Sequence, residues 1–207
     1  MRIARAAAAA VWVLASIVGA ASALAATSGP PVRIGSTLAL TGPLASTGLV
    51  HQIVGDIYVE QLNKKNGLLG RPVEWIVKDD QSKPELARTL YEQLITVDKV
   101  DLLMGPYATG AILSAMGVAQ RYNKMLVHHT FGIPSLAKYD AQFPTWSLGP
   151  DPGTTFPNTL FDALAAQPKP PKTIAIVTSK FPSVHFMSLG AREVAKKRGL
   201  QEVLFLE

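Results

Sequence analysis

The sequence predicts an α/β protein built on a parallel sheet with helices on both faces. Short apolar runs alternate with amphipathic helical segments between residues 32 and 128, an order typical of parallel strands joined by crossover helices. The stretch 102–110, LLMGPYATG, shows one such junction, because an apolar run stops at Gly105 and a helical pattern begins near Ala111. The chain contains no cysteine, so the fold must rest on an apolar core rather than on disulfides.

The first 26 residues have the pattern of a secretory signal peptide. Arg2 and Arg5 form a basic start, residues 6–19 are apolar and uncharged, and small residues dominate positions 20–26. We therefore expect cleavage after Ala25 or Ala26. A membrane anchor is the alternative, but the apolar run is shorter than the ~20 residues that a spanning helix needs. No cysteine follows, so we expect an exported protein that is not a lipoprotein.

The charge of the chain gives little support to nucleic-acid binding. Twenty Lys and Arg against 15 Asp and Glu give a formal net charge of +5, which falls to +3 once Arg2 and Arg5 leave with the signal peptide. No basic run is interleaved with aromatic residues, as a nucleic-acid surface would require. No second long apolar stretch follows, so we expect a soluble mature chain.

Apolar periodicity and turn residues predict the elements in order. Residues 32–38 alternate as a strand does, and two glycines and a proline break residues 40–48. A helix is predicted over residues 49–66, with an amphipathic face at helical spacing; its apolar members are Val50, Ile53, Val54, Ile57, Tyr58 and Leu62. Residues 73–79 predict the second strand, and Pro84 predicts the first turn of the next helix.

The later elements divide the chain into two units. Strands are predicted at residues 101–104 and 125–128, with a helix of small residues at 111–122 between them. Residues 146–153 are rich in Pro and Gly and predict a crossover. A helix at 154–167, a strand at 173–177, a helix at 187–198 and a strand at 203–206 follow. These cannot close a sheet of ordinary size, so we expect residues 27–148 to form a first lobe and 149–207 part of a second, in a longer protein.

The turn after Gly105 is the first candidate binding site. The opening N–H groups of a helix have no partner within the helix, and together with the helix dipole they attract a carboxylate. Ligands of open α/β sheets bind at the carboxyl ends of the strands, where this turn lies. Thr109 can donate its hydroxyl to such a ligand, or it can simply cap the helix.

Two other polar clusters have simpler interpretations. His128 and His129 are adjacent in a predicted strand and point to opposite faces, so we predict no metal site there. Asp79 and Asp80 follow a strand directly, where aspartates commonly make turn and capping contacts. Sequence motifs for a nucleophile elbow, a phosphate loop or a dinucleotide fold are absent, so we predict neither an enzyme nor a cofactor. A periplasmic hydrolase and a ligand sensor remain alternatives.

The order of these features resembles the periplasmic binding proteins of the branched-chain amino acid (Leu/Ile/Val-binding) type, the substrate-binding components of ABC importers. The matching features extend over the whole mature chain: Ile34-Gly35, Thr41-Gly42-Pro43 with Gly48, Asn66-Gly67 with Gly70, Asp79-Asp80 with Pro84, Gly105-Pro106, the loop through Pro134, the crossover ending in Asp151, and Ile174-Ala175-Ile176-Val177. The resemblance implies a type I fold with two α/β lobes and three crossovers. It also implies a periplasmic monomer that takes a small carboxylate to a membrane permease.

The resemblance also assigns candidate ligand residues. In such proteins the hydroxyl at Thr109 and backbone groups of residues 130–132 hold the ligand carboxylate, and the position of Thr47 lines the cleft. Gly132 stands where the amino-acid binders carry Thr, and residues 181–186 replace their aromatic-glycine pair. The expected ligand is a small carboxylate, either an amino acid or an aromatic or aliphatic acid, and Phe131, His185 and Phe186 suit an apolar or aromatic acid better than a free amino acid. The full predicted set is Thr47, Tyr107, Thr109, Thr130, Phe131, Gly132, His185 and Phe186.

Overall fold

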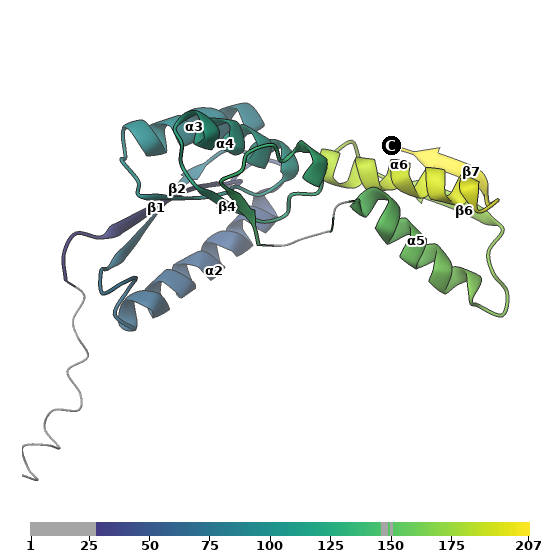
Figure 1. Cartoon of the computed structure of the whole chain (residues 1–207), viewed down its shortest axis with the longest axis horizontal. Helices are drawn as coiled ribbons and strands as arrows, with labels where there is room; N and C mark the ends of the chain where they lie inside the picture. The colour runs from purple at the N-terminus through teal and green to yellow at the C-terminus, as the bar shows by residue number, and fades with distance from the viewer. Residues whose placement is uncertain (1–27, 146–148, 150) are drawn as a thin grey trace, which may run out of the picture.

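The computed structural model describes residues 28–145, 149 and 151–207. It contains a five-stranded sheet in the order β2-β1-β3-β4-β5 and a two-stranded sheet of β6 and β7 (Figure 1). All neighbouring strands in both sheets run parallel. The predicted signal peptide and most of the 146–150 segment lie outside the described residues. None of the helices in the described ranges is long and apolar enough to span a membrane.

The five-stranded sheet forms around the pair of β1 (Val32–Leu38) and β2 (Val73–Asp79). These strands stay in register along their whole length, and both have the predicted bounds. The shorter strands β3 (Leu102–Met104) and β4 (Leu126–His128) continue the sheet. β5 (Gln142–Pro144) completes it and was not predicted, because three residues ending in Pro carry no detectable alternation.

Helices cover both faces of this sheet, as predicted. Figure 1 shows α3 (Pro84–Thr96) and α4 (Thr109–Arg121) together on one face and α2 (Ala45–Lys64) on the other. The main core lies under α3 and α4. Its most completely buried members come from these helices and from β3 and β4: Tyr91, Leu94, Leu103, Ile112, Ala115, Val118, Ala119 and Leu126.

The amphipathic interpretation of α2 is wrong for the described residues. Val50, Ile53, Val54, Ile57 and Tyr58 are 54–66% exposed. The helix instead approaches the sheet through glycines. A Cβ at Gly48 would lie 1.9 Å from the Ala39 carbonyl oxygen, and one at Gly55 would lie 2.1 Å from the Trp75 ring. Close backbone approach therefore orients α2, and its apolar stripe faces outward.

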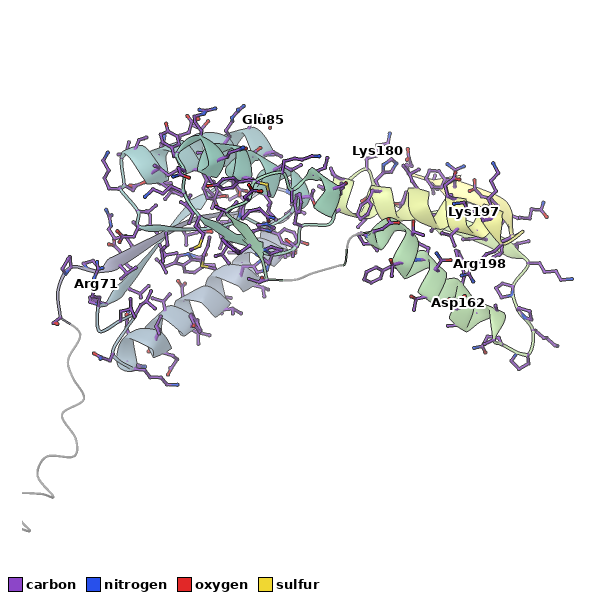
Figure 2. The ribbon with its side chains drawn as sticks, viewed as in Figure 1. Arg71, Glu85, Asp162, Lys180, Lys197 and Arg198 are labelled. Carbon is purple, nitrogen blue, oxygen red and sulfur yellow. The ribbon has the colours of Figure 1, made fainter. Side chains whose placement is uncertain are left out.

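The second unit consists of α5 (Pro152–Ala165), β6 (Thr173–Val177), α6 (Pro182–Lys197) and β7 (Gln201–Leu206). Its small core centres on Phe161, Val194 and Ala195. Figure 2 shows Asp162 on α5 near Arg198 at the end of α6, and the two form an ion pair of 2.7 Å. This pair and the core join the two helices into one layer.

Several helix starts differ from the prediction. The helices α2, α4, α5 and α6 each begin two to five residues earlier than expected. In α5 and α6 a proline occupies the first turn, where its fixed φ suits a helix start and its missing N–H costs nothing. The sequence interpretation counted Pro152 among the breakers of the crossover and placed the start of α6 at Met187, so both predicted starts lie too far along the chain.

Candidate functional site

The turn between β3 and α4 is built by close packing of backbone. Gly105 donates its N–H to the Val127 carbonyl at 2.6 Å, and a Cβ at Gly105 would lie 2.5 Å from the His128 Cβ. Ala108 then takes a φ of +74° as the residue before the helix. The first N–H groups of α4 have no partner within the helix. The strand therefore ends directly at a set of unpaired donors.

Thr109 joins this turn to the loop after β4. Its side chain is 1% exposed, and its Oγ1 accepts the N–H of Gly132 at 3.2 Å. No side-chain hydrogen bond caps α4 within the described chain, so Thr109 does not act as the cap. A hydroxyl that accepts one bond can still donate its own proton.

Figure 1 shows that α6 begins beside the five-stranded unit. Two hollows lie at this junction. The Asp80 hollow, of about 250 Å³, is lined by Asp80, Ser82 and residues 107–111 from the first unit and by residues 181–183 from the second. The Thr130 hollow, of about 300 Å³, is lined by Tyr107, Ala108, Thr130 and Gly132, with Phe156, Ser183, Val184 and Met187 opposite. Both hollows therefore lie between the two units.

The helix starts bring positive dipole ends to this region. The starts of α4 and α6 both line the Asp80 hollow, and each helix start carries the equivalent of roughly half a positive charge. Asp80 is the one acidic side chain among its lining residues. Its carboxylate is 1% exposed and accepts bonds from Thr37 Oγ1 at 2.8 Å and Ser82 N–H at 3.0 Å. Burial raises the pKa of Asp80, although the two hydrogen bonds by themselves would lower it.

The neighbouring Asp79 has a structural role, as predicted. It accepts hydrogen bonds from the backbone of Leu40, Thr41 and Gln81 and from the Thr41 hydroxyl. Burial by itself would raise the pKa of Asp79, but these bonds outweigh it and hold the pKa below its ordinary value. The aspartate pair is therefore a turn-capping device, which confirms the interpretation of these two residues.

Four of the predicted ligand residues come together in the two hollows. Tyr107 lines both, Thr109 lines the Asp80 hollow, and Thr130 and Gly132 line the Thr130 hollow. Thr130 has a φ of +58°, and its Oγ1 is buried with no partner among the described residues. An unpaired buried hydroxyl is costly. Thr130 thus offers a free polar group at the expected place.

The other four predicted residues lie elsewhere. Phe131 is 5% exposed and packs in the core, with its ring 5.5 Å from that of His128. Thr47 lies in the first turn of α2 and lines neither hollow. His185 on α6 pairs with Glu207. Phe186 packs at the junction, where a Cβ at Gly132 would lie 3.2 Å from its ring. That contact gives a physical reason for Gly at position 132.

One cluster was missed by the sequence interpretation. His51 on α2 lies against His129 after β4, with 3.1 Å between their Nε2 atoms, and both rings lie near that of Tyr107. The two histidines are 78 residues apart. Only the packing of α2 over the carboxyl edge of the sheet brings them together, so no sequence spacing could have revealed the pair.

The sequence and the fold are similar to those of known proteins. The sequence pattern of the family described as periplasmic binding protein matches residues 31–205. The chain belongs to the periplasmic binding protein family. The Leu/Ile/Val-binding protein BraC3 of Rhizobium johnstonii is 27% identical over 107 residues, which cover 52% of this chain and 29% of BraC3. The chemotactic substrate-binding protein BasB of Halobacterium salinarum is 30% identical over 112 residues, covering 53% of this chain and 27% of BasB.

Solved structures show the same fold. LivJ of Streptococcus pneumoniae, a branched-chain amino acid transporter substrate-binding protein in complex with isoleucine, has a TM-score of 0.67 at 22% identity and covers 86% of this chain. An ABC transporter solute-binding protein of Rhodopseudomonas palustris with 3,4-dihydroxybenzoic acid has a TM-score of 0.67 at 23% identity, covering 85%. This periplasmic binding protein chain spans 50% and 47% of those chains. The resemblance and the α/β fold class predicted from sequence are both confirmed.

Proposed function

We propose that this protein captures a small carboxylate between its two lobes and delivers it, unchanged, to the permease of an ABC importer. The observation that carries the proposal is the Asp80 hollow, in which the starts of α4 and α6 meet. Unpaired N–H groups with two helix dipoles favour an anion at that point.

The first lobe supplies the polar contacts in this proposal. The N–H groups of residues 109–111 bind the carboxylate, and the Thr109 hydroxyl donates its own proton to it. The Thr130 hydroxyl, buried and unpaired, supplies a further polar contact. Tyr107 lies between the two hollows and lines both, so it contacts the body of the solute. Bonds to a charged acceptor are the strong class of hydrogen bond.

The second lobe supplies an apolar wall. Phe156, Val184 and Met187 line the Thr130 hollow, and Phe181 lines the Asp80 hollow. These side chains suit an aromatic or aliphatic acid, and ligands named for neighbouring structures include 3,4-dihydroxybenzoic acid and 4-hydroxybenzoate. On closure of the lobes, Thr47, His185 and Phe186 complete the proposed contact set, and Phe131 supports the loop of residues 130–132 from the core.

The remaining features of the proposal concern the whole protein. Residues 1–26 direct export to the periplasm and are removed, residues 27–148 form the first lobe, and residues 149–207 belong to the second. The protein acts as a monomer without a cofactor and does not bind nucleic acid. The family and its matched relatives are solute-binding proteins, which supports binding without chemistry.

A thermal-shift screen of the natural protein tests this function. The panel contains aromatic acids, short aliphatic acids and amino acids. A solute that binds with micromolar affinity should stabilise the protein by about 4 kcal/mol at a thousandfold excess over its Kd. Each hit is then incubated with the protein and analysed by mass spectrometry. Recovery of unchanged solute supports a binding protein, whereas a product would make the protein an enzyme such as a hydrolase.

A sensory role is the second candidate function, and one relative favours it. BasB is named as part of a chemotactic signal transduction system. Both roles need the same solute site, so the screen does not separate them. Uptake of radiolabelled solute by cells that lack the gene does: lost uptake supports transport, and lost chemotaxis with normal uptake supports sensing.

A further inference from the structure

Two histidines beside the proposed solute site, His51 and His129, bring one ring nitrogen each close to the other. The chain has four histidines and no cysteine. His51 and His129 place their Nε2 atoms 3.1 Å apart, with ring centroids 4.7 Å apart and ring planes at 68°. His128 points away and bonds Gln142, and His185 pairs with Glu207. The convergence is therefore specific to His51 and His129.

The surroundings of the pair offer further weak ligands and little charge. A hollow of about 310 Å³, the His51 hollow, is lined by both rings and by Ser36, Met104 and Thr145. None of the described residues that line it is acidic. In the free protein, only one proton fits between the two facing nitrogens, because one Nε2 must donate and the other accept. When the proton on the donating Nε2 moves to the Nδ1 atom of the same ring, both Nε2 lone pairs are free for another electrophile.

We propose that His51 and His129 bind a divalent transition-metal ion through their Nε2 atoms. Imidazole is a preferred ligand of copper, nickel and zinc. With metal–nitrogen bonds of about 2.1 Å, a spacing of 3.1 Å between the nitrogens gives a nitrogen–metal–nitrogen angle of roughly 95°. That angle suits neighbouring positions of a tetragonal or octahedral ion.

The protonation state of the pair agrees with this geometry. Metal binding requires both Nε2 lone pairs, so the proton of the donating ring transfers through water to the Nδ1 atom of that ring, and both imidazoles stay neutral. Water and an anionic co-ligand fill the remaining coordination positions, since the hollow contains no carboxylate of its own.

Electron paramagnetic resonance with Cu²⁺ tests the proposal on untagged, chelator-treated natural protein. We expect one bound equivalent whose spectrum shows hyperfine coupling to two imidazole nitrogens. His51→Ala and His129→Ala should each remove the two-nitrogen signal. Each should also weaken Cu²⁺ binding by more than about tenfold, because even the loss of a residue that only supports a metal ligand weakens metal binding by at least about that factor. His185→Asn is the matched control and should leave the spectrum unchanged.

Three results would overturn the metal site: no tight equivalent in the wild type, an unchanged spectrum in His51→Ala, or loss of the signal in His185→Asn. His51 lies on the surface of α2, and circular dichroism checks that His51→Ala still folds. The test therefore remains decisive even if His129→Ala misfolds. The inference does not depend on the proposed transport function, because Cu²⁺ binding is measured without solute and the solute screen is run with chelator.

Discussion

Thr109 links the two loops that form the floor of the proposed site. Because its Oγ1 already accepts the Gly132 N–H, its ligand role depends on the remaining hydroxyl proton. Thr109→Ala should therefore weaken binding of the carboxylate found in the screen by about tenfold or more, since a hydrogen bond to a charged group contributes roughly 1.5–3 kcal/mol. Titration calorimetry measures the affinity.

Thr109→Ser is the matched control for that substitution. It keeps the hydroxyl and removes only a methyl group, so its affinity should stay near that of the wild type. A lowered melting temperature in Thr109→Ala with unchanged affinity would show that Thr109 only holds the Gly132 loop.

His129 predicts a particular dependence of stability on pH. Its folded pKa of about 4 lies below the ordinary value of 6.5. Between these values the unfolded chain binds a proton that the folded chain does not, so the free energy of unfolding should fall as pH is lowered from 6.5 to 4. Urea titrations with chelator present should show a shallower fall in His129→Gln. An identical slope in the variant would assign the loss of stability to other groups.

Single residues were predictable where the cause was local. Asp79 and Asp80 follow a strand, and turn capping needs only neighbours in sequence, so their role was predicted and is confirmed. Thr130 and Gly132 lie in a loop that the strand order places at the same sheet edge as the turn after Gly105. The contact of His51 with His129, and the burial of Phe131 in the core, depend on how helices pack and could not be predicted from spacing.

At the scale of elements, the junction of β3 and α4 leaves no room for a side chain at Gly105. Gly105→Ala should lower the free energy of unfolding by about 1–3 kcal/mol, the usual cost of overpacking, because the new Cβ would lie 2.5 Å from the His128 Cβ. Denaturant unfolding measures the change.

Gly117 in α4 is the control for that experiment. It is exposed, and a Cβ there meets nothing within 4 Å. Gly117→Ala should stabilise the protein by about 0.5–1 kcal/mol through helix propensity alone. If both substitutions had the same effect, the tight contact between β3 and β4 would not be what positions the turn.

Strands were predicted better than helices, for a physical reason. The bounds of β1, β2 and β6 agree with those predicted, because short apolar runs between turn residues mark both ends of a strand. The start of α6 lies at Pro182, five residues before its expected place. The apolar stripe of α2, which faces outward, shows a second limit of sequence-based prediction. Periodicity identified the helix, but the close contacts of its glycines determine which side faces the sheet.

At the scale of the molecule, the parallel order of the strands and the division into two units followed from the sequence. The described residues form two separate sheets, and the lobe bounds 27–148 and 149–207 stay a prediction. The meeting of α4 and α6 at two adjoining hollows was not predictable, because it depends on the placement of one unit against the other.

The central claim is that the meeting of these helix starts selects a carboxylate. Titration calorimetry of the natural protein with the best solute from the screen, and with the uncharged primary amide of that solute, tests it most directly. The two ligands share shape and apolar surface and differ in the charge at one end. The account predicts that the amide binds more than about tenfold weaker, because it loses charge-assisted bonds worth roughly 1.5–3 kcal/mol. Equal affinities for the acid and the amide would contradict the account.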